Sequence, residues 1–179
     1  TKVAQDLIGY VYHKSYGLNV IRVRTFNHEG PRRERYFGIS SYCFQLARME
    51  LGLQKNVLKV GDIKDKRNFI HVLDIVKAYL IAMRMCTPGE LYLIGAEKPE
   101  NIATFEEAIS MLISKSKVDK RIDIEQIKEF TRPTSVPYLI ADSSKFSELT
   151  GWEPSKSLNE ILDDVLGYWR SRVRIHPSL

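Results

Sequence analysis

The chain has 179 residues, 44% of them hydrophobic and 27% charged, a balance typical of one globular domain. Its net charge of +5 suits an anionic small ligand, but no helical segment interleaves basic with aromatic residues, so we expect no nucleic-acid partner. No apolar run approaches the roughly 20 residues of a membrane span, so we expect no membrane contact either. Cys43 and Cys86 lie in apolar segments, as free thiols do in a reducing, cytoplasmic compartment.

Helices and short strands alternate along the first half of the sequence. Apolar side chains recur at helical spacing over residues 2–16, and Gly17 is a natural terminator for that helix. The β-branched run 18–23 predicts a buried strand, and the polar loop 24–33 follows it. The other elements expected in this half are a helix over 38–51, strands over 57–60 and 68–72, a helix capped by Asp74, and a strand over 90–95.

The second half is richer in helix signals. Thr104 and Glu107 have the spacing of a capping box, which predicts a helix start, and Ser157 and Glu160 repeat that spacing before the last helix. Residues 121–124 alternate in polarity, as an edge strand does. The other elements expected here are a proline-punctuated loop over 130–137 and a short helix over 145–149. This order of elements predicts an α/β fold with a smaller C-terminal portion.

The polar loop 24–33 is rich in side chains that bind ligands. Asn27 supplies an amide, His28 an imidazole, and Arg32 and Arg33 supply guanidinium groups, which match the geometry of phosphates. A loop that leaves the carboxyl end of a parallel strand is a common ligand site. The alternative is an ordinary strand-to-helix connection with solvated charges. No Gly-x-Gly-x-x-Gly loop for a dinucleotide occurs in the sequence.

Five parts of the sequence, in this order, resemble the C-terminal half of a known family. The family is that of the extended short-chain dehydrogenase/reductases that act on nucleotide sugars, and GDP-mannose 4,6-dehydratase is the member that the chain resembles. The resemblance extends over nearly the whole chain. Its parts are residues 1–6, which resemble the end of a Tyr-x-x-x-Lys helix, then 26–33, 60–69, 132–137, and 142–145 with 149–154.

This resemblance implies a fold and an activity. The implied fold is the C-terminal part of a Rossmann-like NAD(P)-binding domain over 1–90, with interleaved substrate-domain segments, and a smaller α/β substrate-binding domain over most of 91–179. The implied activity is that of a GDP-mannose 4,6-dehydratase, which acts on a GDP-sugar and uses NADP or NAD. The alternatives are a GDP-6-deoxy-4-keto-mannose reductase, a nucleotide-sugar 4-epimerase, and a non-catalytic module for GDP-sugar binding or dimerisation.

The glycine-rich loop and the catalytic tyrosine of the family are not in this sequence. The resemblance therefore implies a separated half, which lacks the N-terminal Rossmann half and is inactive alone. Lys2 would be the catalytic lysine of the family, which lowers the pKa of the tyrosine and holds the nicotinamide ribose. A surface ion pair between Lys2 and Asp6, one helical turn apart, is the simpler alternative.

Two more residues would contact the cofactor and one the sugar. By family position, His28 and Arg33 contact NADP, and Asn27 lies beside the sugar and the phosphates. His28 could equally be an ordinary loop histidine with its hydrogen bonds satisfied by the protein. The family also implies a homodimer or higher homo-oligomer, with the helix over 2–16 and the helix from Ile39 at the two-fold axis.

Two arginines would bind the nucleotide. Arg67 and Arg132 resemble the pair that grips the diphosphate, for which a planar guanidinium is better suited than an ammonium. The alternatives are that Arg67 belongs to an exposed run of charges and that Arg132 is a surface charge. Ser40 and Ser41 stand where dehydratases often carry Arg-Lys, which favours a reductase, whereas Glu29 favours a dehydratase.

Overall fold

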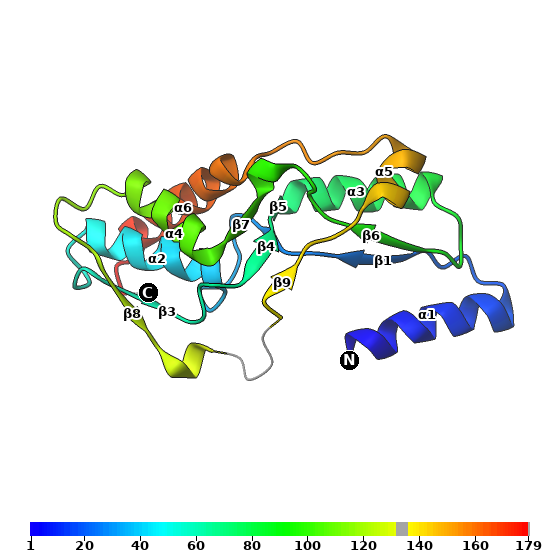
Figure 1. Cartoon of the computed structure of the whole chain (residues 1–179), viewed down its shortest axis with the longest axis horizontal. Coiled ribbons are helices and arrows are strands. Elements are labelled where there is room, and N and C mark those ends of the chain that lie inside the picture. The colour runs from blue at the N-terminus through cyan, green and yellow to red at the C-terminus, as the bar shows by residue number, and fades with distance from the viewer. Residues whose placement is uncertain (132–135, 179) are drawn as a thin grey trace.

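A computed structural model describes residues 1–131 and 136–178 of the chain (Figure 1). The helices are α1 (Lys2–Tyr16), α2 (Gly38–Glu50), α3 (Val72–Met85), α4 (Phe105–Lys115), α5 (Ser144–Thr150) and α6 (Leu158–Ile175), with the 3₁₀ turns η1 (Pro99–Asn101) and η2 (Lys128–Phe130). The strands are β1 (Arg22–Thr25), β2 (His28–Glu29), β3 (Val57–Val60), β4 (Lys66–Asn68), β5 (Ile70–His71), β6 (Leu91–Ile94), β7 (Ile102–Thr104), β8 (Asp123–Gln126) and β9 (Tyr138–Leu139).

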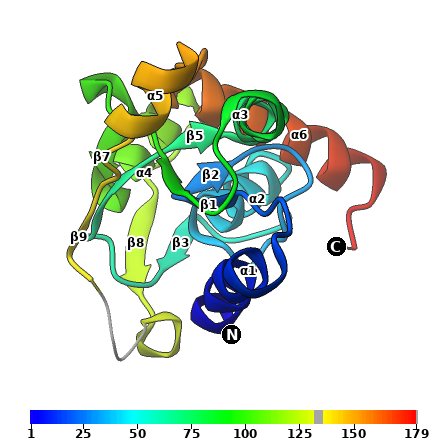
Figure 2. The same cartoon turned by 90° about the vertical axis from the view of Figure 1, so that its right-hand side faces the viewer.

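The described strands form four short sheets. Three of the sheets are parallel pairs, β1 with β6, β2 with β5, and β3 with β8. In the fourth, β4 lies between β7, to which it is antiparallel, and β9, to which it is parallel. Figures 1 and 2 show α1 and α3 on opposite sides of the β1–β6 pair, as expected for part of a Rossmann-like α/β fold. The α/β fold predicted from the sequence is confirmed.

Two hydrophobic cores lie toward opposite ends of the elongated molecule (Figure 1). The larger core joins α2, α4 and α6 to β3, and Leu46, Ile109 and Leu162 are fully buried in it. The smaller core joins α3 and α5 to the β1–β6 pair around Phe146. Because α2 and α6 pack together, the last helix of the chain completes the larger core.

The helix starts marked by capping boxes are confirmed. The Thr104 and Ser157 side chains each accept a hydrogen bond from the backbone three residues on, and the Glu107 and Glu160 side chains each reach back to their cap. Gly17 ends α1 in the left-handed conformation, with φ at 67°. Local patterns therefore predict these three boundaries correctly.

Other boundaries differ from the prediction. Strand β1 begins at Arg22 rather than residue 18, because Leu18 O accepts hydrogen bonds from Val20 N and the His13 ring and so starts a turn. The expectation that Asp74 caps α3 is wrong, because His71 is the cap and its Nδ1 accepts from Leu73 N at 3.2 Å. Asp74 lies inside the first turn of α3. Strand β8 starts two residues later than predicted.

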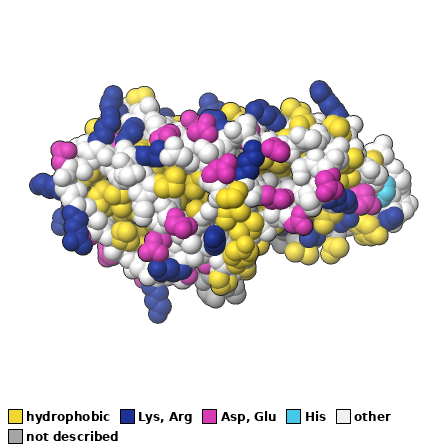
Figure 3. All heavy atoms as spheres, turned by 45° about the horizontal axis from the view of Figure 1, so that its top comes forward, with side chains coloured by type: hydrophobic (Ala, Val, Ile, Leu, Met, Phe, Trp, Pro, Cys, Tyr) yellow, Lys and Arg dark blue, Asp and Glu magenta, His cyan; other side chains and the backbone are white. Residues whose placement is uncertain are grey.

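The surface is mixed in charge. On the face shown in Figure 3, basic and acidic side chains are interspersed, with apolar side chains between them. None of the helices in the described part of the chain combines the length and the apolar character needed to span a membrane.

Candidate functional site

A cleft of about 440 Å³ lies where β2, α2, β3 and β4 meet. Its lining includes Asn27, Glu29, Arg33, Tyr42, Asp65 and Arg67. Three of the site residues predicted from the sequence, Asn27, Arg33 and Arg67, are therefore brought together. They come from segments about 40 residues apart.

Pairing of β2 with β5 positions the first wall of the cleft. Asn27 O accepts a hydrogen bond from Ile70 N at 3.0 Å, and Glu29 lies opposite His71 in the parallel register. The chain then turns at Gly30, where a Cβ would lie only 2.5 Å from Val72 Cγ1. Glycine is required here because any larger residue would push the loop away from α3.

Arg33 is held in a defined orientation. Its Nη1 donates to His28 O at 2.8 Å, and its guanidinium carbon lies 4.2 Å from the centre of the Phe37 ring. Its Nε lies 3.4 Å from Glu29 Oε2. The guanidinium is thus fixed by a backbone carbonyl and an aromatic face, with a buried carboxylate nearby.

Burial of Glu29 dominates the electrostatics of the cleft. Desolvation raises the pKa of this carboxyl to about 7, although the positive charge of Arg33 acts in the opposite direction. Burial raises the pKa of Tyr42 to about 12, with further contributions from the negative charges of Glu29 and Asp62. Tyr42 therefore remains a neutral hydrogen-bonding group at physiological pH.

The second wall of the cleft carries Arg67 on β4. Arg67 Nη2 donates to Asp65 Oδ2 at 2.7 Å, and Nη1 donates to Lys66 O at 2.9 Å. Only 11% of the Arg67 side chain and 12% of the Asp65 side chain are exposed. The alternative that Arg67 belongs to an exposed run of charges is therefore wrong, since this guanidinium is buried and points into the cleft.

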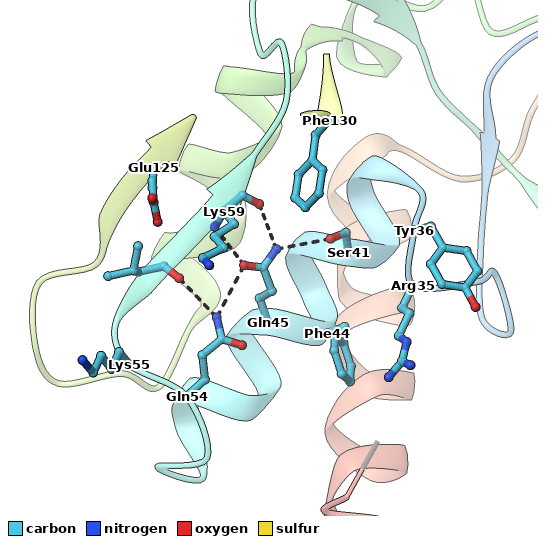
Figure 4. A pocket seen from close by; sticks show the side chains of 11 residues that line it. Arg35, Tyr36, Ser41, Phe44, Gln45, Gln54, Lys55, Lys59, Glu125 and Phe130 are labelled. Atoms are coloured by element: carbon cyan, nitrogen blue, oxygen red, sulfur yellow. Dashed lines mark hydrogen bonds between the residues drawn. The ribbon is translucent and has the colours of Figure 1, made fainter. Parts of the chain in front are cut away.

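A second hollow of about 730 Å³ adjoins the cleft and shares Tyr36, Ser41, Lys59 and Phe130 with it (Figure 4). Gln45 lies between α2 and β3, accepts from Lys59 N at 2.8 Å and donates to Lys59 O at 2.9 Å. Because the Gln45 amide is used by the protein itself, it ties α2 to β3. Phe44 and Phe130 also line this hollow, and the Phe44 ring packs against Trp169 at 5.0 Å between the ring centres.

Two other predicted site residues, His28 and Lys2, do not line the cleft. His28 sits between two lining residues, but its Nδ1 lies 3.0 Å from Phe26 O. Lys2 is exposed at the start of α1, where Nζ donates to Gln5 Oε1 at 3.4 Å. The simpler alternative for Lys2, an ion pair with Asp6, does not form, because Asp6 instead pairs with arginines of β1. Arg132 falls outside the described residues.

Two buried acidic residues of the cleft were not among the predicted site residues. Glu29 and Asp65 each stand two residues from a predicted ligand group, Asn27 and Arg67 respectively. That proximity is the only sequence signal for Asp65, whereas Glu29 also belongs to the segment 26–33 that carries the family resemblance. Their burial depends on strand pairings that the local sequence does not encode.

Comparison with known proteins assigns the chain to a family. The model of the GDP-mannose 4,6 dehydratase family matches residues 1–165. The chain belongs to the GDP-mannose 4,6 dehydratase family. The family match agrees with the resemblance inferred from the five sequence parts.

Curated relatives of this chain are named for different activities. A GDP-6-deoxy-D-mannose reductase from Pseudomonas aeruginosa is 31% identical over 97% of this chain and 56% of its own length. GDP-mannose 4,6 dehydratase 1 from Arabidopsis thaliana is 28% identical over 84% of this chain and 40% of its own length. The chain thus spans about half the length of the curated relatives it matches.

Solved structures show the same fold. The structure of RMD from Pseudomonas aeruginosa complexed with NADPH superposes with a TM-score of 0.86 and 30% identity, over 96% of this chain and 55% of that one. UDP-glucose 4-epimerase from Thermotoga maritima, solved with UDP-glucose, gives a TM-score of 0.78 and 27% identity, over 96% of this chain and 52% of that one.

Proposed function

We propose that this chain forms the substrate-gripping part of an NAD(P)-dependent enzyme that dehydrates GDP-mannose to GDP-4-keto-6-deoxy-mannose. The observation that carries the proposal is the cleft in which Asn27, Arg33 and Arg67 converge. One guanidinium and an amide suit a substrate with phosphates at one end and hydroxyls at the other, and the second guanidinium suits a phosphate of the cofactor beside it. Membership of the GDP-mannose 4,6 dehydratase family supports the same substrate class.

Each residue has a distinct role in this proposal. Arg67 binds the diphosphate, together with Arg132, and Asn27 hydrogen-bonds the sugar. His28 and Arg33 contact NADP, or NAD. Lys2, exposed at the start of α1, acts with the catalytic tyrosine of the family, which residues outside this sequence would supply.

The proposed reaction is redox-neutral. When bound, NADP would accept the hydride of the sugar C4 and return it to C6. The tyrosinate would take the 4-hydroxyl proton, water would leave across C5 and C6, and a proton would return to C5 as the hydride is added. A free tyrosine has a pKa of about 10 and is a poor base at neutral pH. A lysine ammonium beside it stabilises the phenolate, which is the role proposed for Lys2.

Reduction of a GDP-4-keto sugar is the second candidate. Ser40 and Ser41 stand where dehydratases often carry Arg-Lys, and the Pseudomonas aeruginosa reductase is 31% identical to this chain. Ser40 is fully buried and receives a hydrogen bond from Trp169 Nε1 at 2.9 Å, so an arginine would not fit there without repacking. The two reactions differ in their cofactor balance, because a reductase consumes NADPH and a dehydratase does not.

Binding of GDP-mannose to the chain tests the cleft. Replacing Arg67 by Met should weaken the affinity measured by calorimetry by about 10- to 100-fold, as expected when a charged hydrogen-bond partner is lost. Arg121→Met is the matched control, because the Arg121 side chain is 91% exposed and outside the cleft. Equal affinities for both variants would refute the role of Arg67.

Turnover tests the reaction. The chain should be joined to the N-terminal half of the Pseudomonas aeruginosa relative and supplied with GDP-mannose and NADP. Loss of one water from the sugar, measured by mass spectrometry with no net change in NADPH absorbance, is expected. NADPH consumption with the 4-keto sugar would support the reductase instead, and binding without any turnover would support a non-catalytic module.

We also propose that the protein is a homodimer that associates through α1. No residue of α1 is buried, although Val3, Leu7 and Val11 form one apolar stripe along it. The helix from Ile39, expected beside α1 at the two-fold axis, buries its apolar side chains against α4 and α6 within the chain. The contact therefore rests on α1.

A further inference from the structure

Two charged groups in the cleft have buried polar atoms without a hydrogen-bond partner in the described part of the chain. These atoms are Glu29 Oε2 and Arg33 Nε, which lie 3.4 Å apart. A charge-assisted N–H···O bond is shorter, roughly 2.7–2.9 Å. The Asp65–Arg67 pair in the same cleft reaches 2.7 Å. The Glu29 and Arg33 side chains are therefore close enough to attract each other but do not form a hydrogen bond.

Other contacts already fix Arg33. Nη1 donates to His28 O, and the Phe37 ring lies against the guanidinium. The Glu29 carboxyl is therefore not needed to hold the guanidinium in place. The remaining effect of the Glu29 carboxyl is on the net charge that an incoming anion meets at Arg33 and on the buried donor Nε, which has no hydrogen-bond partner among the described residues.

The surroundings of Glu29 make its own charge costly. Only 5% of its side chain is exposed, and the charge of Arg33, which lowers the Glu29 pKa, does not offset the larger effect of burial. Packed against Glu29, α2 contributes Tyr42 and Cys43, whose pKa values rise through burial and, second, through the Glu29 charge. Beside it, β5 contributes His71, whose pKa burial lowers, so no second cation comes from that strand.

We propose that Glu29 sets the net charge that an anionic ligand meets at Arg33, and that binding of such a ligand at Arg33 causes Glu29 to take up one proton. This inference rests on the cofactor role proposed above for Arg33. A phosphate beside the guanidinium brings a second negative charge next to a buried carboxylate, which favours the neutral carboxyl. The proton comes from solvent. The resulting O–H can donate to the ligand, while Nε of Arg33 becomes available to it.

The unliganded chain gives the first test. The Glu29 carboxyl, followed by carbon-13 NMR, should titrate near pH 7, because burial raises its pKa to about that value. Replacing Arg33 by Gln should move the titration to higher pH, because the stabilising cation is gone. A midpoint below pH 5, as for an ordinary ion-paired carboxylate, would overturn the inference whatever the ligand does.

Ligand binding gives the second test. Calorimetry with NADP and with NAD uses the chain joined to the N-terminal half of the Pseudomonas aeruginosa relative, as in the turnover experiment. The affinity should fall by up to about tenfold per pH unit above pH 7, the limit for one linked proton. Glu29→Gln should lose this dependence with both ligands and keep the low-pH affinity, because glutamine mimics the neutral carboxyl. NAD is included as a control because the extra phosphate of NADP has its own pKa of about 6 and could cause a pH dependence by itself.

Controls separate this inference from the proposed function. Glu34→Gln removes an exposed carboxylate from the same loop and should leave the pH profile unchanged. If affinity changed with pH in the same way for the wild type and Glu29→Gln, the proton uptake by Glu29 would be refuted. The cofactor role of Arg33 would be unaffected. Full affinity of Arg33→Gln for NADP, or no binding by the wild type at any pH, would refute that cofactor role and the proton uptake with it.

Discussion

Asp74 is expected to be a main link between the two halves of the fold. Its side chain is 3% exposed and lies in the first turn of α3. Its carboxylate accepts hydrogen bonds from Ser155 N at 3.0 Å, Ser155 Oγ at 2.7 Å and Lys156 N at 3.2 Å. These partners belong to the segment that leads into α6, so Asp74 joins the helix of the smaller core to the last helix of the larger one.

Replacing Asp74 by Ala should lower the free energy of unfolding by about 3 kcal/mol at pH 7. A hydrogen bond to a charged group contributes about 1.5–3 kcal/mol, and the three bonds share one carboxylate, so their contributions do not simply add. For a chain of this size the expected fall in Tm is about 6–12 °C. Urea and thermal unfolding followed by circular dichroism would measure both quantities.

The same contact predicts a pH dependence of definite sign. Burial raises the pKa of Asp74, but the hydrogen bonds from Ser155 and Lys156 outweigh it and bring the pKa below its ordinary value. The stabilisation is therefore complete above the unfolded value of about 3.9 and is lost as the pH falls through the lower folded value. The difference between wild type and Asp74→Ala should be constant from pH 5 to 8 and shrink below pH 4.

A matched variant tests whether Asp74 stabilises the fold through these hydrogen bonds. Asp119→Ala removes an exposed aspartate and should change the stability by less than about 0.5 kcal/mol. If Asp74→Ala were as stable as Asp119→Ala, the three hydrogen bonds would contribute nothing net. If the stability difference grew between pH 6 and pH 3, the assigned direction of the pKa shift would be wrong.

Two further predictions concern packing and association. Gly95→Ala should lower the free energy of unfolding, measured in urea, by at least about 3 kcal/mol, because the added Cβ would lie 2.2 Å from the Ala141 Cβ. Gly167→Ala should be neutral or stabilising, because the added Cβ has open space in α6. Equal effects of the two substitutions would contradict this packing. Leu7→Glu should convert a dimer to a monomer in sedimentation, while Gln5→Glu on the opposite side of α1 should not. A wild type that stays monomeric at 100 µM would refute association through α1.

Local chemistry explains what the sequence predicts well. A capping box needs two side chains three residues apart, and Thr104 with Glu107 satisfies it before any tertiary contact forms. Helical stripes are equally local, which is why both bounds of α2 are within one residue of the prediction and α6 starts directly after the predicted cap. The candidate arginines were found through their resemblance to a family pattern, which is likewise a property of short segments.

Long-range pairing explains what the sequence does not predict. Strand β2 has two residues and β9 has two, too few for any alternation of polarity to show. Each forms only because a distant partner, β5 or β4, lies beside it. Glu29 is buried by one of these pairings, so its unusual carboxyl could not be recognised from its neighbours in sequence.

The two arginines of the cleft differ in how the affinity of each for an anion should depend on pH. Arg67 meets Asp65 at 2.7 Å, so an anion at Arg67 must compete with a carboxylate that already holds it. Arg33 meets Glu29 at 3.4 Å, and protonation of that carboxyl near pH 7 removes the competing charge. An anionic ligand at Arg33 thus displaces a partner by proton uptake, whereas one at Arg67 displaces it by exchange of hydrogen bonds. Below pH 7 the Arg33 end of the cleft should therefore gain affinity for anions more than the Arg67 end.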